Sequence, residues 1–309
     1  MREDDGLGVL PGDVLVGATR LNNPDDDHAG AGRILHYDAA LALKASHAVT
    51  DTTHVIAGLA FDPQGALWAF DYQAHKVLCF DREGRRAAAP NLGSRSYSNI
   101  LFCRDGSMLL GEHLVGAESR VPLGTSLQRD PQTGRFGEGH VFRFDGEGRQ
   151  VAEYATATHG GMGGFLGVTM TALSADERVL YYVSETGPRL MRYDLVEDRQ
   201  LPDLVSYPDD SRQMFFDLAF LADGTLGVLR GDRLERLDAG SGECLESHPL
   251  DGFGWATLCP CADGDGILAT NFFTGELVRY SLSRREVQAR ALVEDARRSL
   301  AGVAEAPAA

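Results

Sequence analysis

The sequence repeats a short pattern in which a hydrophobic segment runs into an aromatic residue or a leucine followed by a polar turn. Six copies are present, and they begin at Tyr37-Asp38, Phe80-Asp81, Phe144-Asp145, Tyr193-Asp194, Leu237-Asp238 and Tyr280-Ser281. Successive copies are separated by 43, 64, 49, 44 and 43 residues. Repeats of about 40 to 50 residues that contain several short strands are typical of β-propeller blades. The sequence therefore predicts an all-β, six-bladed β-propeller, with five- or seven-bladed rings as the alternatives.

The 309 residues are accounted for by six repeats, one insertion and two ends, so we predict a single propeller domain over residues 1–309. Asp13 to Gly17 and Arg33 to Tyr37 read as the second and third strands of a blade without an innermost strand. Ser299 to Pro307 resembles the segment around Ala57 and is predicted to be the missing strand. A C-terminal strand that joins the first blade would close the ring and leave no free sheet edge.

The blade that begins near His54 shows the order of strands most clearly. Val55 to Phe61 reads as an innermost strand, Ala66 to Phe70 as the second, and Lys76 to Phe80 as the third. A tight turn, Asp62-Pro63-Gln64-Gly65, separates the first two.

Composition argues against several classes of partner. The net charge of −16 repels the phosphates of nucleic acids and of anionic lipids, so we expect neither nucleic acid nor a membrane surface as a partner. No segment approaches the roughly 20 apolar residues of a membrane span, and the N-terminal residues do not read as a signal peptide. We therefore expect a cytoplasmic protein. Five cysteines cannot all pair, and their apolar neighbours predict reduced thiols in the core.

The pattern of blades resembles the six-bladed propellers of the gluconolactonase and senescence-marker-protein type, and more loosely the NHL-repeat and strictosidine-synthase-like propellers. The most specific stretch is Leu173 to Ser184, where a polar turn leads into Leu180-Tyr181-Tyr182. The resemblance implies a divalent cation held by Glu, Asn and Asp on innermost strands, together with lactonase activity. The implied positions hold Ala57, Ser98, Thr169 and Phe216, none of which matches. Asn99 and Asp217 stand one residue later, where a regular strand would turn them to the other face.

In such a propeller, one face carries the loops that lead into innermost strands and the loops that follow second strands, so we expect the site there. Six of the nine histidines fall in or beside these loops: His28, His54, His75, His113, His140 and His159. Imidazole is a common metal ligand and a common base. We interpret His54, His113 and His159 as candidate ligands of a divalent metal ion whose identity the sequence leaves open.

Candidate catalytic residues on the same face are His113, Asp217 and Glu185. Asp217 lies in an apolar run, where a carboxylate must be paired or hydrogen-bonded, and an aspartate that binds backbone amides is the structural alternative. Candidate substrate-binding residues are Tyr97, Asn99, Phe216, Trp255, Phe272 and Arg230. The aromatic members of this set favour a small, hydrophobic or aromatic molecule, although some of them belong to the ordinary core.

The spacing of 64 residues marks an insertion at about residues 114–139, directly after Glu112 and His113. A long loop on this face is expected to act as a lid over the channel, with a dimer contact as the alternative. The sequence leaves the oligomeric state open.

Together these features predict an enzyme of small-molecule metabolism. Metal-assisted hydrolysis of a lactone or ester is the leading hypothesis, by analogy of fold. A lyase or isomerase with a histidine base is the second hypothesis, and a propeller that only binds a ligand or a protein is the third.

Overall fold

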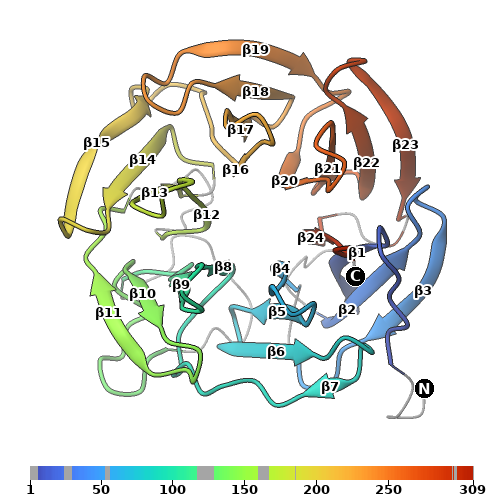
Figure 1. Cartoon of the computed structure of the whole chain (residues 1–309). Coiled ribbons are helices and arrows are strands. Elements are labelled where there is room, and N and C mark those ends of the chain that lie inside the picture. Colours follow the sequence, from blue (N-terminus) through green and yellow to red (C-terminus); the bar gives the residue numbers. More distant parts are fainter. Residues whose placement is uncertain are drawn as a thin grey trace.

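A computed structural model of the chain describes residues 6–23, 30–52, 56–116, 129–158, 167–184, 186–293, 295 and 298–308. Within these ranges every regular element is a strand, and the strands form six four-stranded antiparallel sheets. The sheets stand around a central channel as the blades of a ring (Figure 1). The prediction of an all-β, six-bladed propeller is confirmed.

The strands of each blade follow one another from the channel outward. The first blade contains β24 (Leu300–Glu305), β1 (Val14–Leu21), β2 (Gly30–Tyr37) and β3 (Leu43–Ala48). The second contains β4 (Gly58–Phe61), β5 (Leu67–Asp71), β6 (Lys76–Phe80) and β7 (Arg86–Ala87). The third contains β8 (Leu101–Phe102), β9 (Met108–Gly111), β10 (Val141–Phe144) and β11 (Gln150–Tyr154).

The remaining blades repeat this order. The fourth contains β12 (Met170–Leu173), β13 (Val179–Val183), β14 (Arg189–Asp194) and β15 (Arg199–Ser206). The fifth contains β16 (Asp217–Phe220), β17 (Leu226–Leu229), β18 (Arg233–Leu237) and β19 (Cys244–Pro249). The sixth contains β20 (Trp255–Pro260), β21 (Gly266–Asn271), β22 (Glu276–Ser281) and β23 (Glu286–Leu292).

The ring is closed by β24, which pairs antiparallel with β1, so that Val14 lies opposite Glu305. The pairing extends beyond the strands, where the N–H of Ala306 donates to the carbonyl oxygen of Asp13 at 2.8 Å. In Figure 1 the C-terminal end lies beside β1 and β2, next to the channel. The predicted closure of the first blade by a C-terminal strand is therefore confirmed.

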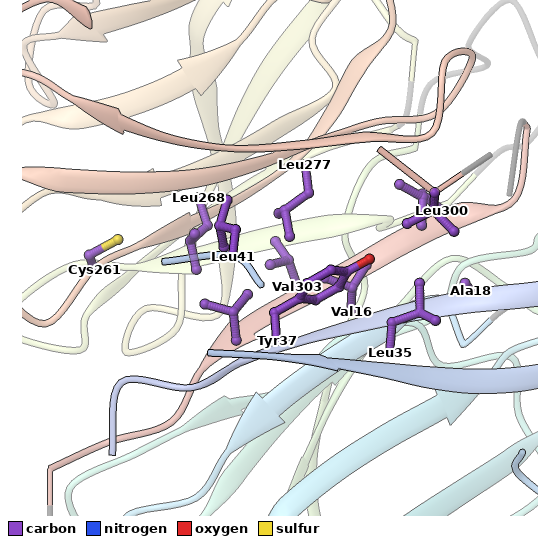
Figure 2. Close-up of a cluster of buried hydrophobic side chains, with 12 residues drawn as sticks. Val16, Ala18, Leu35, Tyr37, Leu41, Cys261, Leu268, Leu277, Leu300 and Val303 are labelled. Atoms are coloured by element: carbon purple, nitrogen blue, oxygen red, sulfur yellow. The ribbon is translucent and has the colours of Figure 1, made fainter. Parts of the chain in front are cut away.

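The blades are held together by apolar side chains packed between neighbouring sheets. Between the first and sixth blades, Val16, Leu35 and Tyr37 belong to one cluster with Leu268 and Leu277 (Figure 2). All five are at most 3% exposed. Because a sheet inside the ring has a neighbour on each side, both faces of its second strand are buried, as along β1. Burial of each such side chain contributes about 1.5–3 kcal/mol to the free energy of folding.

The repeated pair of an aromatic residue and an aspartate has a structural cause, which the second and fourth blades show. The aromatic residue is the last or the second-last residue of the third strand and is buried, as are Phe80 and Tyr193. The aspartate then accepts N–H groups of the turn that leads to the outer strand. The side chain of Asp81 accepts the Arg85 N–H at 2.8 Å, and that of Asp194 accepts two turn amides at 3.0 Å. These backbone hydrogen bonds come first among the causes that lower the pKa of both carboxyls.

No helix among the described residues is long and apolar enough to cross a membrane. The five cysteines are free thiols, of which Cys79, Cys103 and Cys261 are buried. Cys259 is partly buried, whereas Cys244 is exposed on β19, although its apolar neighbour suggested a core position.

Candidate ligand-binding channel

The innermost strands of all six blades enclose a cavity of about 510 Å3 along the axis of the ring. Small-molecule sites commonly have volumes of about 300–1,000 Å3. Most of the lining side chains are apolar, and they include Ala60, Phe102, Met170, Leu218, Leu258 and Val303. The channel thus offers a largely apolar space large enough for a small molecule.

Asn99 is one of the polar side chains on this wall, and it connects the third blade to the fourth. Its amide nitrogen donates to the carbonyl oxygen of Thr169, and its amide oxygen accepts the hydroxyl of Thr171 at 2.9 Å. The adjacent Ser98 hydroxyl donates to the same Thr169 carbonyl at 3.0 Å. Asn99 is therefore fixed in orientation, and its amide group retains a second N–H.

Asp217 is the first residue of β16 and a carboxylate on the cavity wall. Only 7% of the residue is exposed. One carboxylate oxygen accepts the N–H of Leu258 on β20 at 2.7 Å, and the other accepts the N–H of Leu218 at 2.7 Å. These two hydrogen bonds orient the carboxylate group.

Thr257 continues the series of polar links into the sixth blade. Its hydroxyl donates to the carbonyl oxygen of Ala301, on β24 of the first blade, at 3.0 Å and also pairs with the hydroxyl of Thr270. Sequence reasoning did not select Thr171 or Thr257. The available signal was a hydroxyl residue at an innermost-strand position that other blades fill with apolar residues.

His113 and Tyr72 lie together on the face where second strands end. Tyr72 follows β5 and His113 follows β9, and their rings stack with centroids 4.1 Å apart at an angle of 20°. Burial lowers the pKa of His113 to about 3, so the imidazole is neutral at pH 7. The stack shows that loops from neighbouring blades meet on this face. His113 itself lies outside the walls of the cavity.

Glu112 anchors the end of the insertion. One carboxylate oxygen accepts the N–H groups of Glu138, Gly139 and His140 at 2.9, 2.8 and 3.2 Å, and the other accepts Arg95 at 2.8 Å. The described end of the insertion also packs beside the channel, because Phe136 belongs to a cluster with Tyr72, Leu114 and Ala57, and Ala57 lines the cavity. Residues 117–128, the middle part of the proposed lid at about 114–139, lie outside the described residues.

Four of the six proposed substrate-binding residues are buried between blades: Tyr97, Phe216, Trp255 and Arg230. The guanidinium of Arg230 lies 4.2 Å from the centre of the Phe215 ring. It donates to Glu235 at 2.7 Å, to Gln213 at 2.7 Å and to the carbonyl oxygen of Met214 at 2.6 Å. Phe272 is partly exposed, whereas Asn99 lines the cavity.

His54, His159 and Glu185 lie outside the described residues. Among the residues that the structure does describe, no group of three His, Cys, Asp or Glu side chains is arranged to hold a metal ion. Asn99 and Asp217 both line the channel, but the oxygen atoms of both already accept hydrogen bonds. The described donor set does not fit the three-ligand cation site that the gluconolactonase resemblance implies.

No family model and no curated protein matches the sequence. Several solved structures match the fold. A chain of a nidogen/laminin complex is 15% identical with a TM-score of 0.63, and the match covers 96% of this chain and 98% of that one. A protein of unknown function from Bacteroides caccae is 14% identical with a TM-score of 0.62, over 95% and 98% of the two chains.

A third similar structure is a catalytically inactive histidine-to-alanine variant of virginiamycin B lyase from Staphylococcus aureus with quinupristin. It is 13% identical with a TM-score of 0.54, over 90% of this chain and 85% of that one. At these identities the likeness shows the fold alone. The set includes an enzyme and a member of a protein complex, so the fold serves both kinds of function.

Proposed function

We propose that the protein is an enzyme that acts on a small, mostly apolar molecule in the central channel, with Asp217 as its acid–base group. The observation that carries the proposal is a buried carboxylate on the wall of a ligand-sized, largely apolar cavity. A few polar groups in an apolar pocket are the usual composition of a small-molecule site. An ionisable group in such a pocket is a candidate for proton transfer.

The surroundings of Asp217 suit this role. Its two hydrogen bonds to backbone N–H groups hold the carboxylate in one orientation, as proton transfer requires. Asn99 and Thr171 place an amide and a hydroxyl on the same channel wall, where they are able to bind a carbonyl or hydroxyl group of the ligand. Asp217 would accept a proton, and the amide and hydroxyl would orient the molecule that loses it.

Two reaction classes begin with this step. A lyase or isomerase abstracts a proton from carbon, whereas a hydrolase of a lactone or ester removes a proton from the attacking water. The similarity of fold to virginiamycin B lyase supports the first class, and the resemblance to gluconolactonases supports the second. His113 is the alternative base by its position in a loop beside the channel mouth, although burial lowers its pKa and makes the imidazole a weaker base than usual.

The test is turnover of a panel of lactones, aryl esters and substrates for elimination by the purified protein and by Asp217→Asn. The asparagine keeps one oxygen, which is able to accept one of the two backbone N–H groups that Asp217 binds, but it has no carboxylate to accept a proton. We expect kcat to fall at least about 100-fold while KM stays within a few-fold of the wild-type value. Turnover by Asp217→Asn at the wild-type rate would refute the assignment. If only His113→Gln loses turnover, His113 at the channel mouth is the base and Asp217 is not.

A metal-assisted form of the hydrolase is a separate proposal, in which His54, His113 and His159 supply ligands. Metal analysis of the purified protein tests it directly. A stoichiometric transition metal that is lost in His54→Ala and His113→Ala would support it, and a metal-free protein with full turnover would exclude it.

A binding propeller without catalysis is the second candidate function. It is favoured by the observation that Asn99, Asp217 and Thr257 all make hydrogen bonds between blades, which is a sufficient structural role for them. In that case a ligand would bind the channel without turnover, and Asp217→Asn would leave its affinity unchanged.

A further inference from the structure

The innermost strands of the second to sixth blades lead into the same kind of turn, which places their residues on a common scale. In each turn, one N–H donates to the carbonyl oxygen of the residue three positions earlier, at 2.8–3.1 Å. The donors all have positive φ, and they are Gly65, Gly106, Glu177, Gly224 and Gly264. Positions counted back from these five donors should therefore lie at matching heights along the channel.

Hydrogen bonds between neighbouring blades agree with this scale. Asn99, seven residues before its turn donor, binds Thr171, which is six residues before its own. Asp217, also seven residues before its donor, accepts the N–H of Leu258, which is again six residues before its own. The heights inferred from the turns are thus the heights at which the blades touch.

Polar side chains of the cavity wall gather at the level farther from the turns. The residues seven positions before the turn donors all line the cavity, and they are Gly58, Asn99, Met170, Asp217 and Thr257. Thr171 adds a hydroxyl one position nearer to the turns. We refer to Asn99, Thr171, Asp217 and Thr257 as the polar end of the channel.

The wall nearer to the turns is apolar. Residues four or five positions before the turn donors line the cavity there and form what we call the apolar end: Ala60, Phe61, Phe102, Ala219, Cys259 and Pro260. Two carboxylates of the wall lie near this end, and both are engaged. Asp62 accepts two turn N–H groups and the indole N–H of Trp68, while Glu305 accepts Arg279 at 2.7 Å and a backbone N–H at 2.6 Å. Three residues of strand separate the two ends, which corresponds to about 10 Å.

The apolar end opens on the face of the inner turns. Pro63 and Pro307 both line the cavity, and both are exposed. At the opposite limit of the described lining, Ala57 is 6% exposed and Ser98 is fully buried. Ala57 also packs in the cluster that contains Phe136 of the insertion. Along the described wall, solvent therefore meets the cavity at its apolar end, and the polar end lies deeper.

We propose that the channel binds a small amphipathic molecule, which enters from the face of the inner turns with an uncharged hydrogen-bonding head foremost. The head lies at the polar end, where a hydroxyl is able to accept the second N–H of Asn99 and to donate to the carboxylate of Asp217. An anionic head is excluded, because Asp217 repels it in surroundings of low polarity. The apolar tail fills the apolar end.

This inference rests on the proposed function for the location of the site, and it narrows the ligand class. Molecules that carry an alcohol, amide or lactone group on one apolar chain or ring fit this class, whereas carboxylates and phosphates do not. Asn99 and Asp217 select the head, and Ala60 and Ala219 leave room for the tail.

Calorimetric titration of the full-length protein with butan-1-ol, hexan-1-ol and octan-1-ol tests the proposal. For the wild type we expect the affinity to rise about four-fold with each added methylene, since each one leaves water for the apolar end. Octanoate has a tail of similar length but an anionic head, so it should bind at least about ten-fold more weakly than octan-1-ol.

Variants at the two ends should change different features of this series. Asp217→Asn should weaken binding of all three alcohols by the same factor, about ten-fold, and leave the gain per methylene unchanged. Thr171→Val repeats the test of the head without a change of charge, and it should act in the same direction. Ala60→Leu fills the apolar end, so it should keep butan-1-ol within about two-fold of the wild-type affinity and weaken octan-1-ol at least about ten-fold. Leu10→Ala is the control, because Leu10 is a 61% exposed apolar residue that does not line the cavity.

The opposite results would overturn the proposal. Equal weakening of butan-1-ol and octan-1-ol by Ala60→Leu would refute the orientation, and so would unchanged alcohol affinity in both Asp217→Asn and Thr171→Val. Octanoate that binds as tightly as octan-1-ol, or no saturable binding of any alcohol, would refute the ligand class.

These results are separable from the test of the proposed function. If no alcohol binds but Asp217→Asn abolishes turnover, this inference fails and the acid–base role of Asp217 stands. If alcohols bind with the expected dependence on length while Asp217→Asn retains full turnover, this inference stands and the acid–base role fails.

Discussion

Acidification should destabilise the protein through His113 by an amount that follows from its burial. His113 is 4% exposed, and desolvation lowers the pKa of its imidazole from the ordinary 6.5 to about 3. A histidine of the unfolded chain therefore binds a proton at a higher pH than His113 does in the folded protein. The free energy of unfolding falls as the pH drops below 6.5, and this loss continues until about pH 3.

Each pH unit in this window costs about 1.36 kcal/mol. His113 alone should thus lower the free energy of unfolding by about 2 kcal/mol between roughly pH 7.5 and pH 5. Burial also lowers the pKa values of His47 and His248, which adds to the total acid effect. For that reason the quantity to measure is the difference between the wild type and His113→Gln in urea unfolding at the two pH values.

We expect His113→Gln to lose about 2 kcal/mol less than the wild type on acidification. Tyr72→Leu is the matched control, because it removes the stacking partner and keeps the imidazole. Its stability should drop at both pH values, with most of the wild-type pH dependence retained. An equal acid loss in wild type and His113→Gln would show that His113 is not held neutral by burial, and the reasoning would fail.

Three further outcomes are expected. Glu112→Gln should lower the free energy of unfolding by about 2–3 kcal/mol, because the charged acceptor of three N–H groups and of Arg95 is lost. Limited proteolysis should also cut residues 129–139 faster in this variant. An unchanged midpoint of urea unfolding would contradict the anchoring role. In urea unfolding, Leu277→Ala should lower the free energy of unfolding by about 2–5 kcal/mol, because Leu277 is fully buried. Leu292 is 58% exposed, so Leu292→Ala should change that free energy by no more than about 0.5 kcal/mol. Deletion of residues 299–308 should abolish a single cooperative thermal transition because β24 closes the ring; a transition like that of the full chain would argue against the closure.

Much of the ring was predictable because its repeat has a local cause. An aromatic residue near the end of a third strand and an aspartate that binds the following turn both interact with residues close to them in the chain. Such local interactions produce a sequence pattern that repeats from blade to blade. The strand β6, Lys76–Phe80, matches its predicted bounds for this reason. The innermost strand of the second blade begins later than predicted, because β4 starts at Gly58 rather than Val55.

The site was less predictable because its contacts join different blades. Arg230 looked available for a ligand, yet it binds Glu235 and Gln213 and stacks on Phe215. Glu112 receives its hydrogen bonds from the far end of an insertion, about 26 residues away along the chain. Asp217 reaches Leu258, which is 41 residues away. No periodicity encodes such pairs, and only the loop positions on one face were visible in the sequence.

The closure of the first blade has a consequence for the order of events during synthesis. The β1 strand and its partner β24 are separated by almost the entire described chain, so this pair has a very long loop to close. While the ribosome is still making the later blades, the inner edge of β1 stays unpaired and the apolar surface of Val16 lacks its partners from the sixth blade. A growing chain therefore carries an exposed, aggregation-prone strand until β24 emerges, and slow translation of the sixth blade would prolong that interval.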